Sequence, residues 1–377
     1  MIISYEHLEI LRTAILYALC SAFFAFLWAP LLAKFLYKYK IQRHNDFDPT
    51  LAIGGSTSKK GTPIMGGLLV IITVALITFF FNWDRSYTWM PIGAMLLASV
   101  LGGLDDILNN VIGRKRRIRK IRHVLRLIRV HKDWKQRIWL TLTLPWTMFK
   151  RTSLWLGSHP GKGLHVHERL IMQFLTGAIA AWWIYFKLGE DWRQVHVPFD
   201  GFIDFGWLLI PIIILVVMLT ANAVNFTDGM DGLAGGSLVI TFSTLTLLSW
   251  MEGYDAITYL NATTTGALIT YTYFNIKPAR FQMGDVGSLG LGALLAINAI
   301  VVNQMLMLPL LGFIFYVEIA TVIIQIAGRY VLGRKIFKMA PIHHHFELRG
   351  WSEEKTVMRF WFIHAAFVLL GLWVALF

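Results

Sequence analysis

Long hydrophobic runs without a single Asp, Glu, Lys or Arg recur along the whole chain, separated by short polar stretches. The eight such runs are residues 13–33, 61–83, 86–104, 170–186, 205–227, 232–251, 256–276 and 360–377. Residues 286–328, interrupted only by Glu318, are long enough for two more. Because a bilayer core about 30 Å thick requires roughly 20 helical residues, the pattern predicts ten transmembrane helices. We therefore expect an all-α polytopic membrane protein in which residues 1–377 form one integral-membrane domain.

The composition agrees with this class. Hydrophobic residues make up 56% of the 377 residues and charged residues 15%, and the mean hydropathy is +0.57, which excludes an ordinary soluble domain. The first run lacks a basic leading segment and an obvious cleavage site, so we do not expect a removable signal peptide. The single cysteine, Cys20, cannot form an intramolecular disulfide and is interpreted as a small apolar packing residue.

The charges of the loops predict the orientation of the ten helices. The loops at 34–60, 277–280 and 329–359 are basic, whereas the loops between them carry mainly acidic residues. Since positively charged short loops stay on the cytoplasmic side, both termini are predicted to be periplasmic. The same assignment places five aspartates on the cytoplasmic face: Asp105, Asp106, Asp228, Asp231 and Asp285.

The net charge of +13 comes from one loop. Residues 111–162 contain fifteen Lys or Arg and one acid, Asp133, so the rest of the chain is close to neutral. A charge confined to one cytoplasmic insertion argues against nucleic-acid binding. The arginines at 119, 122, 126 and 129 recur at helical spacing among apolar residues, and Trp134, Trp139, Trp146 and Trp155 follow. This pattern favours a helix lying on anionic lipid. An inert insertion and a docking site for a partner remain the alternatives.

The aspartates suggest the chemistry. An ionised carboxylate is costly to bury without a partner, so acidic residues at a membrane edge point to a bound cation or to proton chemistry. Mg²⁺ is commonly held by one or two carboxylates and completes its shell with water and substrate phosphates, which makes a diphosphate substrate the natural expectation. The glycines in NFTDGMDG at 225–232 and QMGDVGSLG at 282–290 would let backbone amides approach phosphate oxygens.

Basic residues near these loops are candidate hydrogen-bond donors to substrate phosphate. They are Lys59 and Lys60 in STSKKGTPIMGG and the histidines of MAPIHHHFELRGW, His343, His344 and His345. Three adjacent histidines cannot all point one way on a helix, so a three-histidine metal site is not expected.

Simpler interpretations of these residues stay open. Asp105 and Asp106 could cap a helix end, DGMDG could be an ordinary turn, and the two lysines could be a positive flank of a membrane helix. Glu318 and His364 lie within hydrophobic runs and could be functional or structural.

Five strings occur in the order of one known family. SKKGTPIMGG, LGGLDD, NAVNFTDGMDGLA, YFNIKPARFQMGDVGSLGLG and MAPIHHHFELRGW closely resemble the polyprenyl-phosphate N-acetylhexosamine-1-phosphate transferases. The PIHHHFE block resembles the branch that transfers a muramoyl-peptide. The resemblance covers essentially the whole chain except the basic insertion at 111–162.

The resemblance implies a ten-helix fold with periplasmic termini and a cytoplasmic active site in the bacterial inner membrane. It implies that undecaprenyl phosphate attacks UDP-N-acetylmuramoyl-pentapeptide, giving the lipid-linked diphosphate sugar and UMP with Mg²⁺ as cofactor. We favour direct attack over a covalent aspartyl intermediate, because a lipid phosphate is already an anionic nucleophile. A homodimer is also expected from the family.

The family's functional residues carry over by position. Asp105, Asp106 and Asp285 resemble the catalytic residues, and Asp285 with Asp228 resembles the metal ligands. The residues that would bind substrate are Lys59, Lys60, Thr62, Asn222, Asn225, Asp228, Asp231, Asn275, His343, His344 and His345.

Two positions depart from the family pattern. Gln282 stands where an aromatic residue usually precedes MGD, with Phe281 one place earlier, and Asn109 stands where a basic residue is common. Two rival functions are a sister transferase that uses another UDP-N-acetylhexosamine and a transporter. A transporter would place its polar residues near the bilayer midplane rather than at one face.

Overall fold

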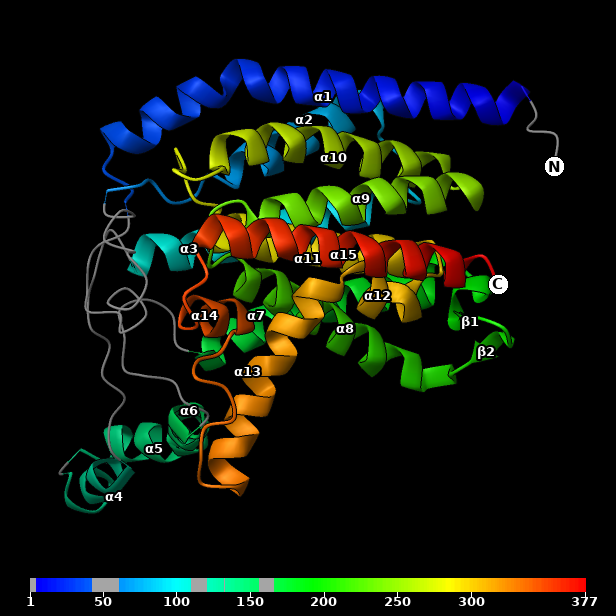
Figure 1. Cartoon of the computed structure of the whole chain (residues 1–377). Coiled ribbons are helices and arrows are strands. Elements are labelled where there is room, and N and C mark those ends of the chain that lie inside the picture. The colour runs from blue at the N-terminus through cyan, green and yellow to red at the C-terminus, as the bar shows by residue number, and fades with distance from the viewer. Residues whose placement is uncertain (1–4, 43–60, 110–120, 132, 156–165) are drawn as a thin grey trace.

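Ten helices, α1 to α3, α7 to α11, α13 and α15, correspond to the ten hydrophobic segments in the part of the chain that the structure describes (Figure 1). The structure is a computed structural model that describes residues 5–42, 61–109, 121–131, 133–155 and 166–377. The bounds of these helices are α1 Tyr5–Lys38, α2 Leu68–Phe81, α3 Trp89–Ile107, α7 Val166–Trp183, α8 Leu209–Thr227, α9 Leu233–Met251, α10 Asp255–Asn275, α11 Gly284–Val301, α13 Phe313–Val331 and α15 Glu353–Ala375.

Eight of these helices are long and apolar enough to cross a membrane, so the protein is a multi-pass membrane protein. The eight do not include α2, a shorter apolar helix, or α10. The hydrophobic run at 61–83 is helical only from Leu68 because its first residues pair with another segment. The amide of Gly66 donates to the Gln282 carbonyl oxygen at 2.7 Å, and the Gln282 amide donates to the Pro63 carbonyl oxygen at 2.8 Å.

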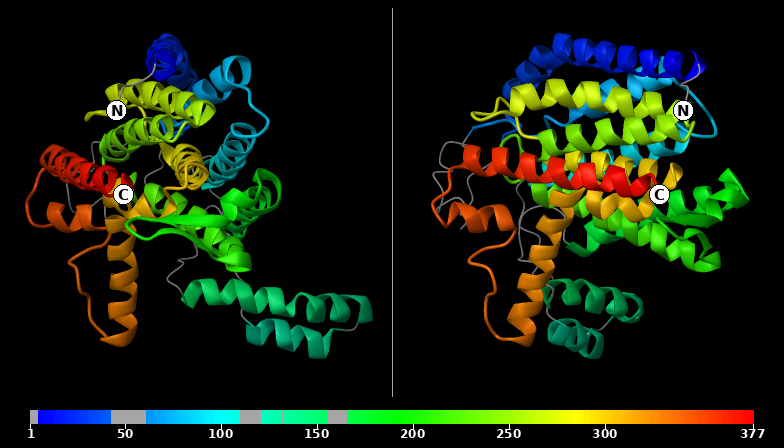
Figure 2. Two further views of the ribbon diagram at one scale, coloured as in Figure 1. Left: turned by 90° about the vertical axis from the view of Figure 1, so that its right-hand side faces the viewer. Right: turned by 45° about the vertical axis from the view of Figure 1, so that its right-hand side comes forward.

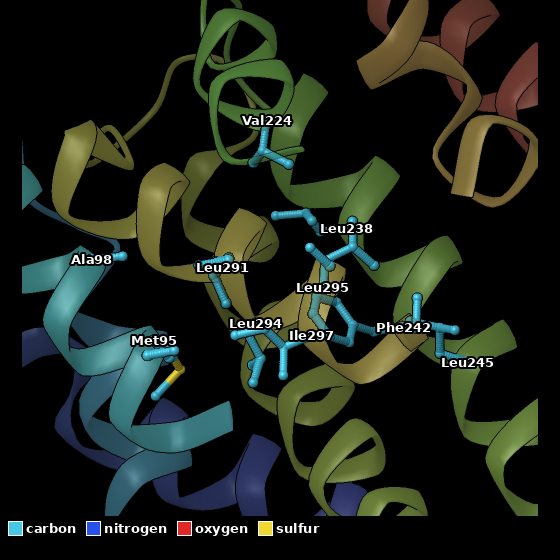
Figure 3. Packing of buried hydrophobic residues seen from close by; sticks show 14 of the residues in the cluster. Met95, Ala98, Val224, Leu238, Phe242, Leu245, Leu291, Leu294, Leu295 and Ile297 are labelled. Carbon is cyan, nitrogen blue, oxygen red and sulfur yellow. The ribbon is translucent and has the colours of Figure 1, made fainter. Parts of the chain in front are cut away.

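Helix α11 is the centre of the bundle. Every residue from Val286 to Val301 is buried, and the surrounding helices α3, α8 and α9 supply the apolar contacts seen in Figure 3. Small residues bring neighbouring backbones close to α11. A Cβ on Gly67 of the α2 start would overlap Gly287, and a Cβ on Gly292 would lie 2.6 Å from the Cα of Ala221 on α8. Such small-residue contacts are a usual means of helix association within membranes.

The ends of the helices separate two faces of the molecule. The α3, α8 and α10 carboxyl ends and the α7, α11 and α15 amino ends lie together at the left of Figure 1, and the two chain termini lie at the opposite end. The loops predicted to share one face therefore do meet at one end of the bundle.

A small hairpin breaks the otherwise helical structure, and the prediction of an all-α fold missed it. Strands β1 (Gln194–Val197) and β2 (Gly201–Asp204) pair antiparallel between α7 and α8. A one-turn π-helix (Ile184–Leu188) and a 3₁₀ turn (Glu190–Arg193) precede them, and a second 3₁₀ turn (Gly206–Leu208) follows. The strands have four residues each, too few for the sequence periodicity to reveal.

Part of the basic insertion forms three short helices beside the bundle, α4 (Ile121–Val130), α5 (Trp134–Leu142) and α6 (Leu144–Trp155) (Figure 2). The helical spacing of the arginines is confirmed from residue 121 onward. Trp146 and Phe149 of α6 contact the His167 ring at the start of α7, at centroid distances of 5.7 and 5.9 Å. These contacts join the insertion to the bundle at the end that carries Asp105 and Asp106.

Short elements complete the carboxyl-terminal half. A 3₁₀ turn (Met305–Met307) and α12 (Leu308–Leu311) connect α11 to the steeply inclined α13, and α14 (Ile342–Glu347) precedes α15. The histidine run lies on α14.

Candidate active site

The amino end of α11 gathers the predicted carboxylates. The Gly284 amide donates to Oδ2 of Asp228 at 3.1 Å, and the Val286 amide donates to Oδ2 of Asp106 at 3.1 Å. The first amides of a helix lack partners within the helix, and the helix dipole favours negative charge there. Gly284 has φ +73°, a left-handed conformation that suits glycine, and it turns the chain into the helix. The helix start therefore offsets part of the cost of burying these acids.

Asp285, the first acidic residue of α11, lies between an amide and a guanidinium. Asn225 on α8 donates from Nδ2 to Oδ1 of Asp285 at 2.7 Å, and also to Oγ of Ser288 at 2.8 Å. The guanidinium of Arg169 is 3.7 Å from Oδ2 of Asp285. The Asp285 side chain is 22% exposed, whereas Asp105 is almost completely buried, so Asp285 is the more accessible of these carboxylates.

Arg169, from the first turns of α7, forms an ion pair with Asp105 and lies near Asp285. It connects the end of α3 to the start of α11. Arg169 is not among the site residues predicted from the sequence. The available signal was a charged residue at the edge of a hydrophobic run on the same face as the aspartates, but the fifteen basic residues just before it obscured it.

The closeness of α3 and α11 brings Asp105 and Asp106 to the site. A Cβ on Gly102 would overlap the backbone of Asp285, so only glycine permits this approach. Helix α3 also continues through both aspartates to Ile107. The sequence interpretation ended the hydrophobic segment at residue 104, and the hydrogen bond from the Val286 amide to Asp106 accounts for the ordered last turn.

The DGMDG loop, between α8 and α9, is held by three other elements. The Asp231 amide donates to Oε1 of Glu353 on α15 at 2.9 Å, and the Gly232 amide donates to Oδ1 of Asn275 on α10 at 2.9 Å. The Ala279 amide lies 3.4 Å from Oδ2 of Asp231. This network makes the loop more than an isolated turn and fixes Asp228 and Asp231 at the same end of the bundle.

Ion pairs between Lys277, just after α10, and the start of α15 stabilise the same end of the bundle. Nζ of Lys277 lies 2.9 Å from Oε1 of Glu354 and 3.3 Å from Oε2 of Glu353. Burial lowers the pKa of Lys277, but its hydrogen bonds and charge interactions with these two glutamates outweigh burial and leave the pKa raised. The ammonium therefore stays charged. It holds Glu353 where Oε1 accepts the hydrogen bond from the Asp231 amide.

The three histidines point to three different partners, as their spacing predicts. His343 is buried, with Nδ1 3.1 Å from Oε1 of the buried Glu318, and its ring fills the space against Gly229 of the DGMDG loop. Nδ1 of His344 lies 2.9 Å from Oε2 of Glu347, and the Lys338 amide donates to Nδ1 of His345 at 3.2 Å. Burial, followed by the nearby His343, lowers the pKa of His344, so the neutral ring is favoured. Of these three contacts, that of His343 is with the loop that carries Asp228.

His364, the other ionisable residue inside a hydrophobic run, links α15 to α9. Its Nε2 lies 2.9 Å from Oγ1 of Thr241 and 3.1 Å from the Ser237 carbonyl oxygen. These contacts support the structural interpretation of this residue.

Several predicted residues lie apart from the carboxylates. Asn222 exchanges hydrogen bonds with Gln173 of α7, at 2.7 and 3.1 Å, and does not reach the α11 start. Asn275, expected near the nucleotide, is 2% exposed, and its Nδ2 donates to the Phe281 carbonyl oxygen at 2.9 Å. Thr62 adjoins the segment that pairs with Gln282. Lys59 and Lys60 are outside the described residues.

Phe281 does not replace the aromatic residue that the family pattern leads one to expect at position 282. Its side chain is 1% exposed and packs between Tyr271 and Phe274, each at a ring centroid distance of 5.9 Å. A base bound at the surface of the site cannot stack on it without rearrangement of this core.

The donor set at the α11 start fits a hard divalent cation. Carboxylate oxygens of Asp106, Asp228 and Asp285 surround one helix turn, and hard oxygen ligands are those that Mg²⁺ prefers. Among the described residues, no three His, Cys, Asp or Glu side chains are arranged to enclose a metal by themselves. A Mg²⁺ site commonly uses one or two carboxylates and takes its remaining ligands from water and substrate phosphates.

Comparisons with known proteins agree on one family. Residues 160–303 match the model of glycosyl transferase family 4. A phospho-N-acetylmuramoyl-pentapeptide-transferase of Halalkalibacterium halodurans is 30% identical over 325 residues, covering 84% of this chain and 84% of the relative. Relatives with the same name from Chloroflexus aurantiacus (34% identical, covering 84% of this chain and 78% of the relative) and Leptospira biflexa (31%, covering 95% and 92%) also align.

Proposed function

The chain belongs to the phospho-N-acetylmuramoyl-pentapeptide transferases, and we propose that the carboxylates at the start of α11 form its active site. The enzyme transfers phospho-N-acetylmuramoyl-pentapeptide from the UDP-linked donor to undecaprenyl phosphate, the first membrane step of peptidoglycan synthesis. The observation that carries the site assignment is the convergence of Asp105, Asp106, Asp228 and Asp285 on one helix turn, from three segments far apart in the sequence.

The reaction exchanges one phosphoanhydride for another. An oxygen of undecaprenyl phosphate forms a bond to the sugar-linked phosphorus, and the bond from that phosphorus to the bridging oxygen breaks, so UMP leaves with the electron pair. No external energy source is required, and catalysis rests on positioning and on charge stabilisation.

Each group of residues has a role in this scheme. Asp105 and Asp106 orient the lipid phosphate, and Asp105 accepts its proton when it arrives protonated. Arg169 holds the carboxylates of Asp105 and Asp285 in fixed positions relative to each other. It also offers a positive charge to the phosphoryl group that is transferred. Asn225 fixes the rotamer of Asp285 through its Nδ2 hydrogen bond. His343 packs against Gly229 and supports the DGMDG loop. Lys59, Lys60 and Thr62 contact the phosphate or sugar of the donor.

Mg²⁺ is the proposed cofactor; Asp285 with Asp228 would hold it, and when bound it would supply positive charge to the donor diphosphate and the departing UMP. The support for it is the hard-oxygen donor set and the partial exposure of Asp285. Removing divalent cations with a chelator is expected to abolish turnover, and adding Mg²⁺ back restores it.

We further propose the finer topology from the loop charges. Ten helices cross the bacterial cytoplasmic membrane, the carboxylate end faces the cytoplasm, and both termini are periplasmic. The positions of the termini opposite the carboxylates support this arrangement.

The basic insertion is proposed to lie on anionic lipid beside the cytoplasmic mouth of the site. Arg122, Arg126 and Arg129 are exposed on α4, and Trp134 and Trp139 of α5 are 64% and 67% exposed. Exposed cations with exposed aromatic residues suit the headgroup region of an anionic membrane. A homodimer is the proposed assembly from the family resemblance.

The decisive experiment is magnesium-dependent release of UMP by the purified protein from UDP-N-acetylmuramoyl-pentapeptide and a polyprenyl phosphate. The control panel contains UDP-N-acetylglucosamine and UDP-N-acetylgalactosamine. The names of the relatives do not favour the sister transferase, and release from these sugars but not from the muramoyl-pentapeptide would be required to restore that alternative. Absence of UMP release with every substrate and metal would overturn the proposal.

A further inference from the structure

A polar cleft lies at the opposite end of the bundle from the carboxylates. It has a volume of about 700 Å³, within the range of roughly 300–1,000 Å³ that is usual for ligand sites. Helix α3 begins at this cleft and carries Asp105 and Asp106 in its last turn, so about 25 Å of helix separates the two sites. The residues that line the cleft are Trp83, Arg85, Ser86, Tyr87, Trp89, Trp182, Trp183, Lys187 and Leu188.

Four of the nine residues that line the cleft are tryptophans. Trp83 packs edge-on against Trp89 with centroids 5.6 Å apart, and Nζ of Lys187 lies 5.6 Å from the Trp182 ring. Trp83, Trp89 and Trp182 remain 42%, 53% and 51% exposed although they are large and hydrophobic. Tryptophan at the end of a membrane helix typically lies at the level of the lipid headgroups. The cleft therefore opens at the membrane interface on the side away from the carboxylates.

Two cations, Arg85 and Lys187, line this aromatic cleft. Arg85 and Lys187 are exposed, neither forms an ion pair with a carboxylate of the described residues, and none of the nine lining residues is acidic. The acid next to Arg85, Asp84, is used elsewhere, because its Oδ1 accepts from the amides of Ser86 and Tyr87 at 2.6 and 2.8 Å. The cleft thus combines two cations with an apolar wall.

The backbone on one side of the cleft has an unusual form. The chain of α7 continues as one π-helical turn at Ile184–Leu188, which carries Lys187, and then turns at Gly189 with φ +124°. Single π-helical turns are rare and often occur at functional sites. Here the turn presents the Lys187 ammonium to the same cleft as Arg85 from the α2–α3 connection.

We propose that this cleft binds the headgroup of an anionic phospholipid in the membrane leaflet opposite the carboxylates. The phosphate lies between Arg85 and Lys187, with charge-assisted hydrogen bonds to both, and the glycerol backbone and first acyl carbons rest on the tryptophans. This site is independent of the transfer reaction, because it lies at the other end of α3 and shares no residue with the carboxylate cluster.

Lipid titration followed by native mass spectrometry tests this proposal. The detergent-purified full chain is titrated with phosphatidylglycerol, with phosphatidylethanolamine and with soluble glycerol phosphate, and the bound fraction is measured for each. We expect one tight phosphatidylglycerol site, weaker phosphatidylethanolamine binding and no retention of glycerol phosphate. The double variant Arg85→Gln, Lys187→Gln should bind phosphatidylglycerol about thirtyfold more weakly.

Arg193 supplies the matched control, since it lies at the same end of the molecule but its guanidinium rests 4.9 Å from the Tyr185 ring and does not line the cleft. Arg193→Gln should bind phosphatidylglycerol like the parent chain. Both variants should keep the thermal midpoint of the parent chain without added lipid, which shows that they fold. Equal phosphatidylglycerol affinity in the parent and the double variant, or equal losses in the double variant and Arg193→Gln, would overturn the site. Retention of glycerol phosphate as strong as that of the lipid would identify a free-phosphate site instead.

Discussion

Asp285 differs from the buried Asp105 and Asp106 because its carboxylate is partly exposed, and its Oδ1 accepts a hydrogen bond from Asn225. In Asp285→Asn the side chain keeps its shape and its Oδ1 acceptor but loses the negative charge and one hard oxygen ligand. We expect turnover to fall by about 10²–10³ with little change in the thermal midpoint. Initial rates of UMP release at saturating donor, together with a thermal melt in detergent, measure both quantities.

A change in the magnesium requirement separates metal binding from a general role of Asp285. The Mg²⁺ concentration that gives half-maximal rate should rise in Asp285→Asn and stay at the parental value in Asn222→Ala. Asn222 is a suitable control because it hydrogen-bonds to Gln173 and does not reach the cluster. Near-normal turnover with an unchanged magnesium requirement would remove Asp285 from the metal site.

Arg169 is a positioning residue in the proposed scheme, since one guanidinium faces both Asp105 and Asp285. Lysine restores the charge but is a point charge that cannot serve two carboxylates with fixed geometry. We expect Arg169→Gln to lower kcat about 100-fold and Arg169→Lys to recover part of that loss, with KM for the UDP donor changed less than kcat. The kcat and KM of the two variants, from UMP release, decide the point. A parental kcat in Arg169→Gln would show that the ion pair with Asp105 has no part in turnover.

At the scale of elements, the distance between α3 and α11 depends on Gly102. A methyl group there would overlap the Asp285 backbone, so Gly102→Ala must push the two helices apart. Overpacking of this kind typically costs about 1–3 kcal/mol. The expected results are a lowered thermal midpoint in detergent and a larger loss of UMP release than the loss of folded protein explains.

Gly93, on the same helix, is the matched control for Gly102. A Cβ at Gly93 would meet no atom within 4 Å, and alanine is the better helix former. Gly93→Ala should therefore leave the thermal midpoint equal or higher and the activity unchanged. If both alanine variants behave alike, the close approach of α3 and α11 does not determine the geometry of the site.

The basic insertion is an element that the proposed chemistry does not require. Its described helices contact the bundle through Trp146 and Phe149 at His167. Replacing residues 121–155 with a Gly/Ser linker should leave turnover close to that of the intact chain when UMP release is assayed in detergent. A loss as deep as that of Asp285→Asn would give the insertion a direct part in the reaction.

The hydrophobic pattern predicted the long helices well because length and the absence of charge are strong local signals. The shortened α2 and the β1–β2 hairpin were not predictable in the same way. Residues 61–67 are uncharged, and their hydrogen bonds to Gln282 and Met283, more than two hundred residues away in sequence, help to hold them in a non-helical conformation.

The site shows the same division between local and long-range information. The aspartates were identifiable because charge at a membrane edge is conspicuous and because their motifs resemble a family. The role of Arg169 depends on the packing of α7 against α3, which no local pattern encodes. Asn275 and Phe281 also belong to recognisable motifs, yet both are buried and support the backbone around the site. Motif membership alone does not separate a residue that touches substrate from one that holds the loop.

At the scale of the whole molecule, the orientation in the membrane can be tested with one labelling experiment. The chain has a single cysteine, Cys20, so Cys20→Ser gives a cysteine-free background. Asp200, in the β1–β2 hairpin, and Lys335, in the loop after α13, are both exposed and lie at opposite ends of the bundle. The basic loops predict that position 200 is periplasmic and position 335 cytoplasmic. In spheroplasts, a membrane-impermeant maleimide should label Asp200→Cys directly but label Lys335→Cys only after permeabilisation. The reverse pattern would place the carboxylate cluster on the periplasmic side, where a UDP-linked donor made in the cytoplasm could not reach it, and would therefore contradict the proposed topology and reaction together.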